Sequence, residues 1–165
     1  MERITGTRFF ERVLAGERDF HKAFMLENFT ASQDPLYASV RDYLQKHAAS
    51  FRDDPVCIDD SIFVKVCLDG LMLQYLEAES THLTNVKFAQ TNLNHAYFGY
   101  ASLRNVDFSA SRHEGLKFNG AKLRRVKGLE VSYFGEGELY GRVEDYKLIE
   151  EDTTMNFTLR RIDRL

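Results

Sequence analysis

The chain has 165 residues, of which 44% are hydrophobic and 13% aromatic, and its formal net charge at pH 7 is −3. This length predicts one domain, and the many Phe and Tyr residues exclude a disordered chain. No apolar run is long enough to span a bilayer, and the N-terminal sequence MERITGTRFFERV lacks the apolar core of a signal peptide, so we expect a cytoplasmic protein.

The first thirty residues combine helical and β-strand signals. A helix is predicted over residues 7–15, with Gly16 ending it. Phe20 and Met25 then lie five residues apart, which predicts a first, imperfect turn of β-structure within residues 19–30.

A second helix is predicted after this turn. Asp34 is its expected N-cap, and Pro35 stands at the first helical position. Apolar or half-polar side chains recur at helical spacing at Leu36, Val40, Tyr43, Leu44, His47 and Phe51. Asp53-Asp54-Pro55 then ends the N-terminal region, residues 1–55. We expect this helix to cover the end of the repeats that follow, and a partner-binding helix is the alternative.

From Val56 to Tyr133 the sequence repeats every five residues. The residues at every fifth position are mostly large and apolar: Ile58, Phe63, Leu68, Leu73, Ala78, Leu83, Phe88, Leu93, Phe98, Leu103, Phe108, His113, Phe118, Leu123, Gly128 and Tyr133. Two places before each of them stands a small or aliphatic residue, as at Val56, Ser61 and Val66. A fixed short period of this kind indicates a solenoid.

The repeated units resemble those of the pentapeptide-repeat family, A-(D/N)-(L/F)-x-x. The best matches are Thr91-Asn92-Leu93, Ala96-Tyr97-Phe98, Ala101-Ser102-Leu103, Val106-Asp107-Phe108 and Ala121-Lys122-Leu123. The resemblance implies an all-β solenoid, a right-handed quadrilateral β-helix with one repeat on each side and four repeats per coil. Residues 56–134 would form about four coils, with an N-terminal α-helical insertion or cap.

With four repeats per coil, residues twenty apart stack, and the inward residues form one column on each side. These columns are Ile58, Ala78, Phe98 and Phe118 on the first side, Phe63, Leu83, Leu103 and Leu123 on the second, Leu68, Phe88, Phe108 and Gly128 on the third, and Leu73, Leu93, His113 and Tyr133 on the fourth. In the middle coils, leucines occupy one opposed pair of sides and phenylalanines the other. This sorting supports the coil length.

Two residues interrupt the columns. His113 falls where Leu or Phe should point inward, so it predicts either a polar site inside the tube or, as the favoured interpretation, a bulged or loosened coil with His113 half exposed or bonded to the backbone. Gly128 leaves its inward position unfilled, which predicts a void or a chain break near the last coil.

The second side is the candidate site for an anionic partner, because its outward residues include no acid. Its outward basic residues are Lys65, His82, Arg104, Lys122, Arg124 and Arg125. The alternative is a solvated face that keeps the protein soluble.

The first side begins with acidic residues and continues with tyrosines. Its acids are Asp59, Asp60, Glu77 and Glu79. Tyr97 and Tyr100 flank Gly99 and form a candidate aromatic patch for protein contact.

No constellation of residues indicates catalysis. The sequence has no glycine-rich phosphate loop, nucleophile elbow or paired metal-ligand motif. Cys57 and Cys67 would lie on opposite sides of one coil, out of reach of a disulfide, and no His stands at zinc-ligand spacing from them. We therefore expect no enzyme, no cofactor and no metal site.

The C-terminal region, residues 135–165, is expected to be a cap or tail. Met155, Phe157 and Leu159 alternate cleanly with polar residues, which predicts a strand or hairpin, and a frayed helical end over 160–164 is the alternative for the last residues. In some family members the C-terminal segment forms a dimer interface, so the resemblance also admits a homodimer.

The favoured function is that of a non-enzymatic, rigid scaffold that binds another protein. The alternative implied by the resemblance is a DNA-mimic modulator of a type II topoisomerase such as gyrase, which would need a long acidic surface. Residues 71–134 instead hold eight Lys or Arg and five Asp or Glu. Nucleic acid is a less favoured partner, because no exposed aromatics interleave with the basic residues.

Overall fold

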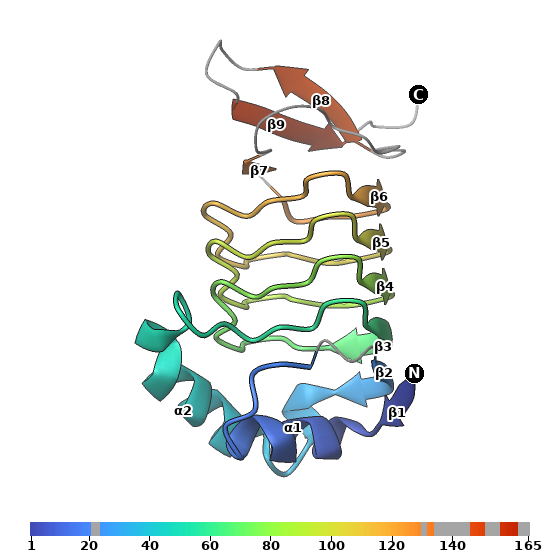
Figure 1. Cartoon of the computed structure of the whole chain (residues 1–165). Coiled ribbons are helices and arrows are strands. Elements are labelled where there is room, and N and C mark those ends of the chain that lie inside the picture. Colours follow the sequence, from blue (N-terminus) through green and yellow to red (C-terminus); the bar gives the residue numbers. More distant parts are fainter. Residues whose placement is uncertain (21–23, 130–131, 134–145, 151–155, 162–165) are drawn as a thin grey trace.

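A parallel sheet of six short strands forms one side of the solenoid. Its strands are β1 (Glu2–Ile4), β2 (Phe24–Thr30), β3 (Ile62–Cys67), β4 (His82–Thr84), β5 (Ser102–Arg104) and β6 (Lys122–Arg124), hydrogen-bonded in that order. This computed structural model describes residues 1–20, 24–129, 132–133, 146–150 and 156–161, with side chains for the first two of these ranges (Figure 1).

The pairing register confirms four repeats per coil. Leu83 pairs with Phe63 and with Leu103, and Leu103 pairs with Leu123, so the strands β3 to β6 follow one another at steps of twenty residues. The other sides keep the same step through single bridges, which join Cys57 to Glu77 on the first side and Cys67 to Lys87 on the third. The predicted fold class, a right-handed quadrilateral β-helix, is confirmed.

Each repeat ends in a left-handed corner. A residue with positive φ recurs at every fifth position, from Asp60 (φ 58°) to Arg125 (φ 53°). Most of these corners are not glycine, and Ala110 has a φ of 55°. An L-residue in this conformation costs about 1–2 kcal/mol, so stacking between coils must offset the strain.

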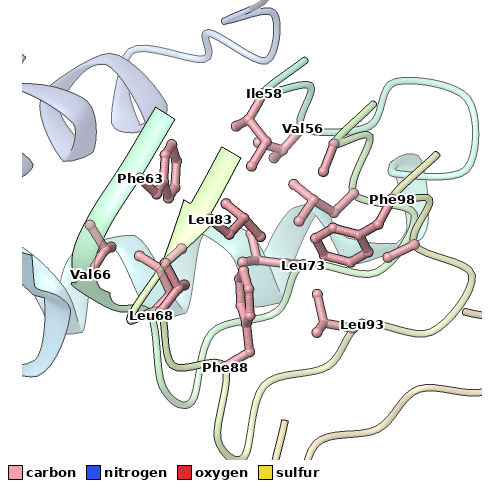
Figure 2. Close-up of a cluster of buried hydrophobic side chains, with 14 of the residues drawn as sticks. Val56, Ile58, Phe63, Val66, Leu68, Leu73, Leu83, Phe88, Leu93 and Phe98 are labelled. Carbon is pink, nitrogen blue, oxygen red and sulfur yellow. The ribbon is translucent and has the colours of Figure 1, made fainter. Parts of the chain in front are cut away.

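The core is a set of stacked side chains inside the tube (Figure 2). Phe88 stacks on Phe108 at 5.5 Å between ring centroids, and Phe98 stacks on Phe118 at 5.6 Å. Rings on the two opposed sides meet edge to face, as Phe88 and Phe98 do at 6.0 Å. The leucine columns of the second and fourth sides fill the remaining space, which confirms the predicted sorting.

Buried hydroxyl groups replace aliphatic side chains at some of the small positions. Ser61, Thr81 and Thr91 are fully buried. The Thr81 hydroxyl donates to the Ala78 carbonyl at 2.9 Å, and the Thr91 hydroxyl donates to the Leu68 carbonyl at 3.0 Å. These bonds remove the cost of burying a polar group inside the tube.

Acceptor side chains on the corners bond backbone N–H groups of the next coil. The Glu79 N–H donates to Asp59 Oδ1 at 2.6 Å, the Ala89 N–H donates to Asp69 Oδ1 at 2.8 Å, and the Glu114 N–H donates to Asn94 Oδ1 at 3.0 Å. In each case donor and acceptor lie twenty residues apart. Asp and Asn at this position therefore hold neighbouring coils together.

Helix α1 (Gly6–Leu14) lies under the first coils (Figure 1). Its N-cap Thr5 accepts a hydrogen bond from the Arg8 N–H at 3.1 Å, and Gly16 follows its end with a φ of 91°. The predicted helix and its glycine stop are confirmed. Phe9 packs its ring 6.4 Å from Phe63, so α1 covers the N-terminal end of the tube.

Strand β2 confirms the early β-structure predicted within residues 19–30. Leu26 pairs with Phe63 of β3, although the two are not twenty residues apart. The inserted segment between them contains two short 3₁₀ turns, Ala31–Gln33 and Ala48–Ser50, on either side of helix α2 (Tyr37–His47).

The predicted start of α2 is wrong. Asp34 is not its N-cap, because the helix begins three residues later, after Leu36. Asp34 instead holds the preceding turn, since its Oδ1 accepts from the Leu36 N–H at 2.9 Å and its carbonyl accepts from the Tyr37 N–H at 3.0 Å. Both bonds close a turn that precedes the helix, so the Asp34 side chain does not cap the first helical N–H groups.

Helix α2 packs against the first coil through part of its predicted stripe. Val40 and Leu44 are buried, and the Tyr37 hydroxyl donates to the Asp69 carbonyl at 3.0 Å. The guanidinium of buried Arg18 lies 4.9 Å from the Tyr43 ring and donates to the Tyr43 hydroxyl at 2.9 Å. That α2 covers the N-terminal end of the tube stays a prediction. The aromatic contacts at this end come from α1.

His113 is half-buried and lies against the Ser111 backbone, as the favoured interpretation expected, but the bulged coil that it also predicted is wrong. Its Nδ1 lies 3.2 Å from both the hydroxyl and the carbonyl oxygen of Ser111. The Leu93 N–H still donates to the Arg112 carbonyl at 2.7 Å, so the coil keeps its register. The ladder holds the backbone in place, and the imidazole finds its partners locally.

Gly128 does not leave the predicted void. A Cβ added there would lie 2.3 Å from the Ser109 backbone nitrogen, so the glycine packs directly on the coil below. Its φ of 81° also turns the chain out of the repeat conformation. The regular ladder reaches Lys127, whose N–H donates to the Val106 carbonyl at 3.0 Å.

Beyond the array, the described residues form a second, small sheet. It contains β7 (Ser132–Tyr133), β8 (Tyr146–Glu150) and β9 (Asn156–Arg161), with β9 antiparallel to both others. The helical alternative is wrong for Arg160 and Arg161, which belong to β9. Met155, the first residue of the predicted alternation, lies outside the described residues, and the capping role stays a prediction.

Replacing Phe98 by Ala should lower the free energy of unfolding by about 3–5 kcal/mol, because it empties the centre of the phenylalanine stack. Urea denaturation followed by circular dichroism measures this loss. Tyr100→Ala, at a side chain that is 65% exposed, is the control and should change stability by about 0.5 kcal/mol or less. A loss below about 1 kcal/mol for Phe98→Ala would contradict the packing described.

Replacing Asp69 by Ala should cost about 1–3 kcal/mol, because the Ala89 N–H then loses its acceptor. Asp69→Asn keeps an acceptor oxygen at the same place and should lose less than half as much. The same denaturation experiment compares the two variants. Equal losses would show that the inter-coil bond does not stabilise the fold.

Candidate functional site

The interior of the array offers no room for a ligand among the residues that the structure describes. The inward side chains of the second side, for example, are all buried: Phe63, Leu83, Leu103 and Leu123. An open hollow lies instead beside β1 and β2, lined by Thr5, Met25 and Phe29 among others. It brings together no set of catalytic side chains, so the outward sides are the candidate sites.

The second side, called the basic side below, displays its cations on a flat parallel sheet. All six predicted residues, Lys65, His82, Arg104, Lys122, Arg124 and Arg125, are exposed. Strand pairing aligns Arg104 with Arg124 and places Lys122 two residues away on β6. Four of the six therefore gather on the last two coils.

The basic side carries no carboxylate between residues 62 and 125. Its other outward residues are Ile62, Val64, Thr84, Asn85, Ser102 and Asn105. Among the described residues, no ion pair involves Lys65, Arg104, Lys122 or Arg125. The neighbouring β2 adds Glu27, whose carboxylate lies 3.9 Å from the Arg3 guanidinium. Within this side, the last two coils therefore display basic residues with no outward acidic residue beside them.

The two predicted tyrosines lie on the first side and rest on glycines. A Cβ at Gly99 would lie 2.2 Å from the Tyr97 ring, and a Cβ at Gly120 would lie 2.7 Å from the Tyr100 ring. Tyr97 is half-buried, while Tyr100 is 65% exposed. Burial, and then the negative charge of Glu79, raises the pKa of Tyr97. Each glycine therefore leaves room for the neighbouring ring.

Acids of the first side lie close to Cys57. The backbone of Cys57 forms a parallel β-bridge with Glu77 of the next coil. Cys57 also lies two residues before Asp59. Burial raises the pKa of the Cys57 thiol to about 12, and the charges of Asp59 and Glu77 add to this. Burial and the charge of Asp59 also raise the pKa of Glu77. Comparing residues twenty apart would have found this cluster.

The second thiol occupies the equivalent place on the third side. Cys67 bridges to Lys87 and lies two residues from Asp69. Burial raises its pKa, while the charge of Lys87 opposes the shift. Both cysteines are free, as their predicted positions on opposite sides required.

The repeat itself matches a known family. A family model described as pentapeptide repeats, with eight copies, matches residues 79–109. This match confirms the resemblance predicted from the units between Val56 and Tyr133. A search of curated proteins finds no match.

Solved structures of two such proteins resemble the chain at low identity. One trypsin-treated variant of QnrB1, a plasmid-mediated fluoroquinolone resistance protein, is 12% identical over 63% of this chain and 56% of its own, with a TM-score of 0.32. A second variant is 14% identical over 76% of this chain and 69% of its own, also with a TM-score of 0.32.

HetL, a pentapeptide-repeat protein involved in heterocyst differentiation regulation in the cyanobacterium Nostoc sp. strain PCC 7120, is 13% identical over 50% of this chain and 42% of its own, with a TM-score of 0.19. The chain thus spans little more than half of the first QnrB1 structure.

In the described part of the chain, no helix combines the length and hydrophobicity needed to cross a membrane.

Alkylation by iodoacetamide at pH 8 should be slow at both cysteines and slowest at Cys57, because a thiol with a pKa of about 12 is almost wholly protonated. Mass spectrometry of timed digests measures both rates, with free cysteine as the reference. The unfolded protein in urea is the control and should react at the rate of free cysteine. Reaction of folded Cys57 at that rate would contradict its raised pKa.

Proposed function

We propose that this protein is a non-enzymatic, cytoplasmic scaffold that uses its basic side to bind an acidic segment of another protein. The observation that carries this proposal is the row of exposed cations on β3–β6, with no carboxylate among them. The filled interior supports a binding function over catalysis, since no enclosed site is present among the described residues.

The geometry favours a partner that lies across the strands. Arg104 and Arg124 stand in register on neighbouring strands, which are about 4.8 Å apart in any β-sheet. Arginine binds carboxylates through two parallel hydrogen bonds, so a row of them suits a row of Asp and Glu side chains. Because the backbone ladder already fixes these positions, little backbone conformational entropy is lost on binding.

Long-range attraction would also speed the encounter. Clustered charges of one sign raise the association rate of an oppositely charged partner, and this effect weakens as salt is added. A strong salt dependence of binding is therefore part of the proposal. The half-buried Tyr97 and exposed Tyr100 lie on another side and offer a second contact patch.

The experiment is a pull-down from cell lysate with the wild-type chain and a variant that carries Arg104→Glu, Lys122→Glu, Arg124→Glu and Arg125→Glu. We expect the variant to capture at least tenfold less of the partner protein, because the charge reversals turn electrostatic attraction into repulsion. The matched control reverses four exposed cations on other surfaces, through Lys46→Glu, Arg52→Glu, Arg112→Glu and Lys117→Glu. Both variants are checked for folding by thermal denaturation.

Equal capture by the wild type and the basic-side variant would refute the proposed face. Partners that nuclease treatment removes would indicate nucleic acid instead of an acidic protein. Weakening of capture between low and physiological salt, measured on the purified partner, is the expected electrostatic signature.

Modulation of a type II topoisomerase is the second candidate. The observation in its favour is the acidic group on the first side, which includes Asp59, Asp60, Glu77 and Glu79. This group spans only the first coils, whereas imitation of DNA needs a long acidic surface. A gyrase supercoiling assay without any effect at micromolar protein would remove this candidate.

A further inference from the structure

Three potential metal ligands converge on the first side of the tube. One ligand atom from each of Cys57, Asp59 and Glu77 lies within 4.8 Å of the others. They come from two neighbouring coils, which the ladder holds together because the Glu77 N–H donates to the Val56 carbonyl at 3.0 Å and the Ile58 N–H donates to the Glu77 carbonyl at 2.8 Å. The spacing of the three groups is therefore set by backbone hydrogen bonds.

The cluster is both oriented and accessible. Asp59 Oδ1 accepts from the Glu79 N–H at 2.6 Å, which fixes the carboxylate and leaves Oδ2 for another contact. Backbone bonds of this kind orient ligands in metal sites. Cys57 and Asp59 are half-buried while Glu77 is exposed, so an ion can reach the cluster from solvent.

The third side provides an internal comparison. Cys67, Asp69 and Lys87 occupy the same places in their repeats as Cys57, Asp59 and Glu77, and Asp69 accepts the equivalent hydrogen bond from the Ala89 N–H at 2.8 Å. Only the third group differs, a lysine in place of a glutamate. The fold therefore accepts a lysine side chain at this place in the coil. The backbone hydrogen bonds of the ladder do not require the Glu77 carboxylate.

Further carboxylates gather around the cluster. Asp59, Asp19 and Glu79 all lie close enough to Glu77 to repel its carboxylate. A bound divalent ion would turn this repulsion into attraction. On the third side, Lys87 stands in place of the glutamate, so this repulsion between carboxylates does not arise there.

We propose that Cys57, Asp59 and Glu77 form a binding site for Zn²⁺. A thiolate with two carboxylates suits this borderline-soft ion, whereas Ca²⁺ and Mg²⁺ prefer all-oxygen sites. On binding, the Cys57 thiol gives its proton to the solvent and the sulfur bonds the metal, with water completing four ligands. Because Glu77 is exposed, its side chain has room to turn toward a bound ion.

Isothermal titration calorimetry of the tag-free, reduced full chain with Zn²⁺ alone tests the site. We expect one ion per chain, with at least tenfold weaker binding in Cys57→Ser and in Glu77→Gln. The matched control Cys67→Ser should bind within twofold of the wild type. Titration with Co²⁺ should produce thiolate-to-metal absorption that Cys57→Ser removes and Cys67→Ser keeps.

A gain of binding gives the sharpest result. Lys87→Glu completes the equivalent set on the third side with Cys67 and Asp69, and should raise the stoichiometry from one ion to two. Glu77→Gln keeps the test valid if Cys57→Ser fails to fold. Absence of Zn²⁺ binding by the wild type, or unchanged affinity in both Cys57→Ser and Glu77→Gln, would overturn the proposal.

Discussion

The hydrogen bonds between coils are the constraint on which the rest of the structure depends. Each bond joins residues close to twenty apart, as between the Phe88 N–H and the Asp107 carbonyl at 2.8 Å. Because this step is constant, every side chain stands directly above its equivalent in the previous coil. The core stacks, the row of cations and the thiol–carboxylate cluster are all consequences of one repeated pairing.

The sequence predicted the array well, because two inward positions in every five leave a fixed short period that indicates a solenoid. It also placed all six basic residues on one exposed side. The irregular places were harder. His113 was expected to disturb its coil, but Ser111 satisfies its imidazole and the ladder keeps its register. Local polarity was given too much weight against backbone bonds that cooperate over several coils.

Other features were missed because they depend on atoms that a repeat pattern does not describe. Gly128 was assigned an empty inward position, whereas it packs against the Ser109 backbone. Asp34 carried a helix-start signal but closes the turn before the helix. Cys57 was considered only as a partner for Cys67 or His, so the two nearby carboxylates were overlooked.

The corners with positive φ, such as Asn85 (φ 56°) and Asn105 (φ 56°), make each repeat a quarter turn of the chain. Insertion of five residues at such a corner would leave every inward and outward position intact and yet rotate all later residues onto the next side. Arg124 and Arg125 would then leave the row that begins at Lys65, while an insertion of twenty residues would only lengthen the tube. Which residues share a side of the tube thus depends on the number of repeats that precede them. An insertion that leaves the core packing unchanged can therefore separate the residues of a binding face.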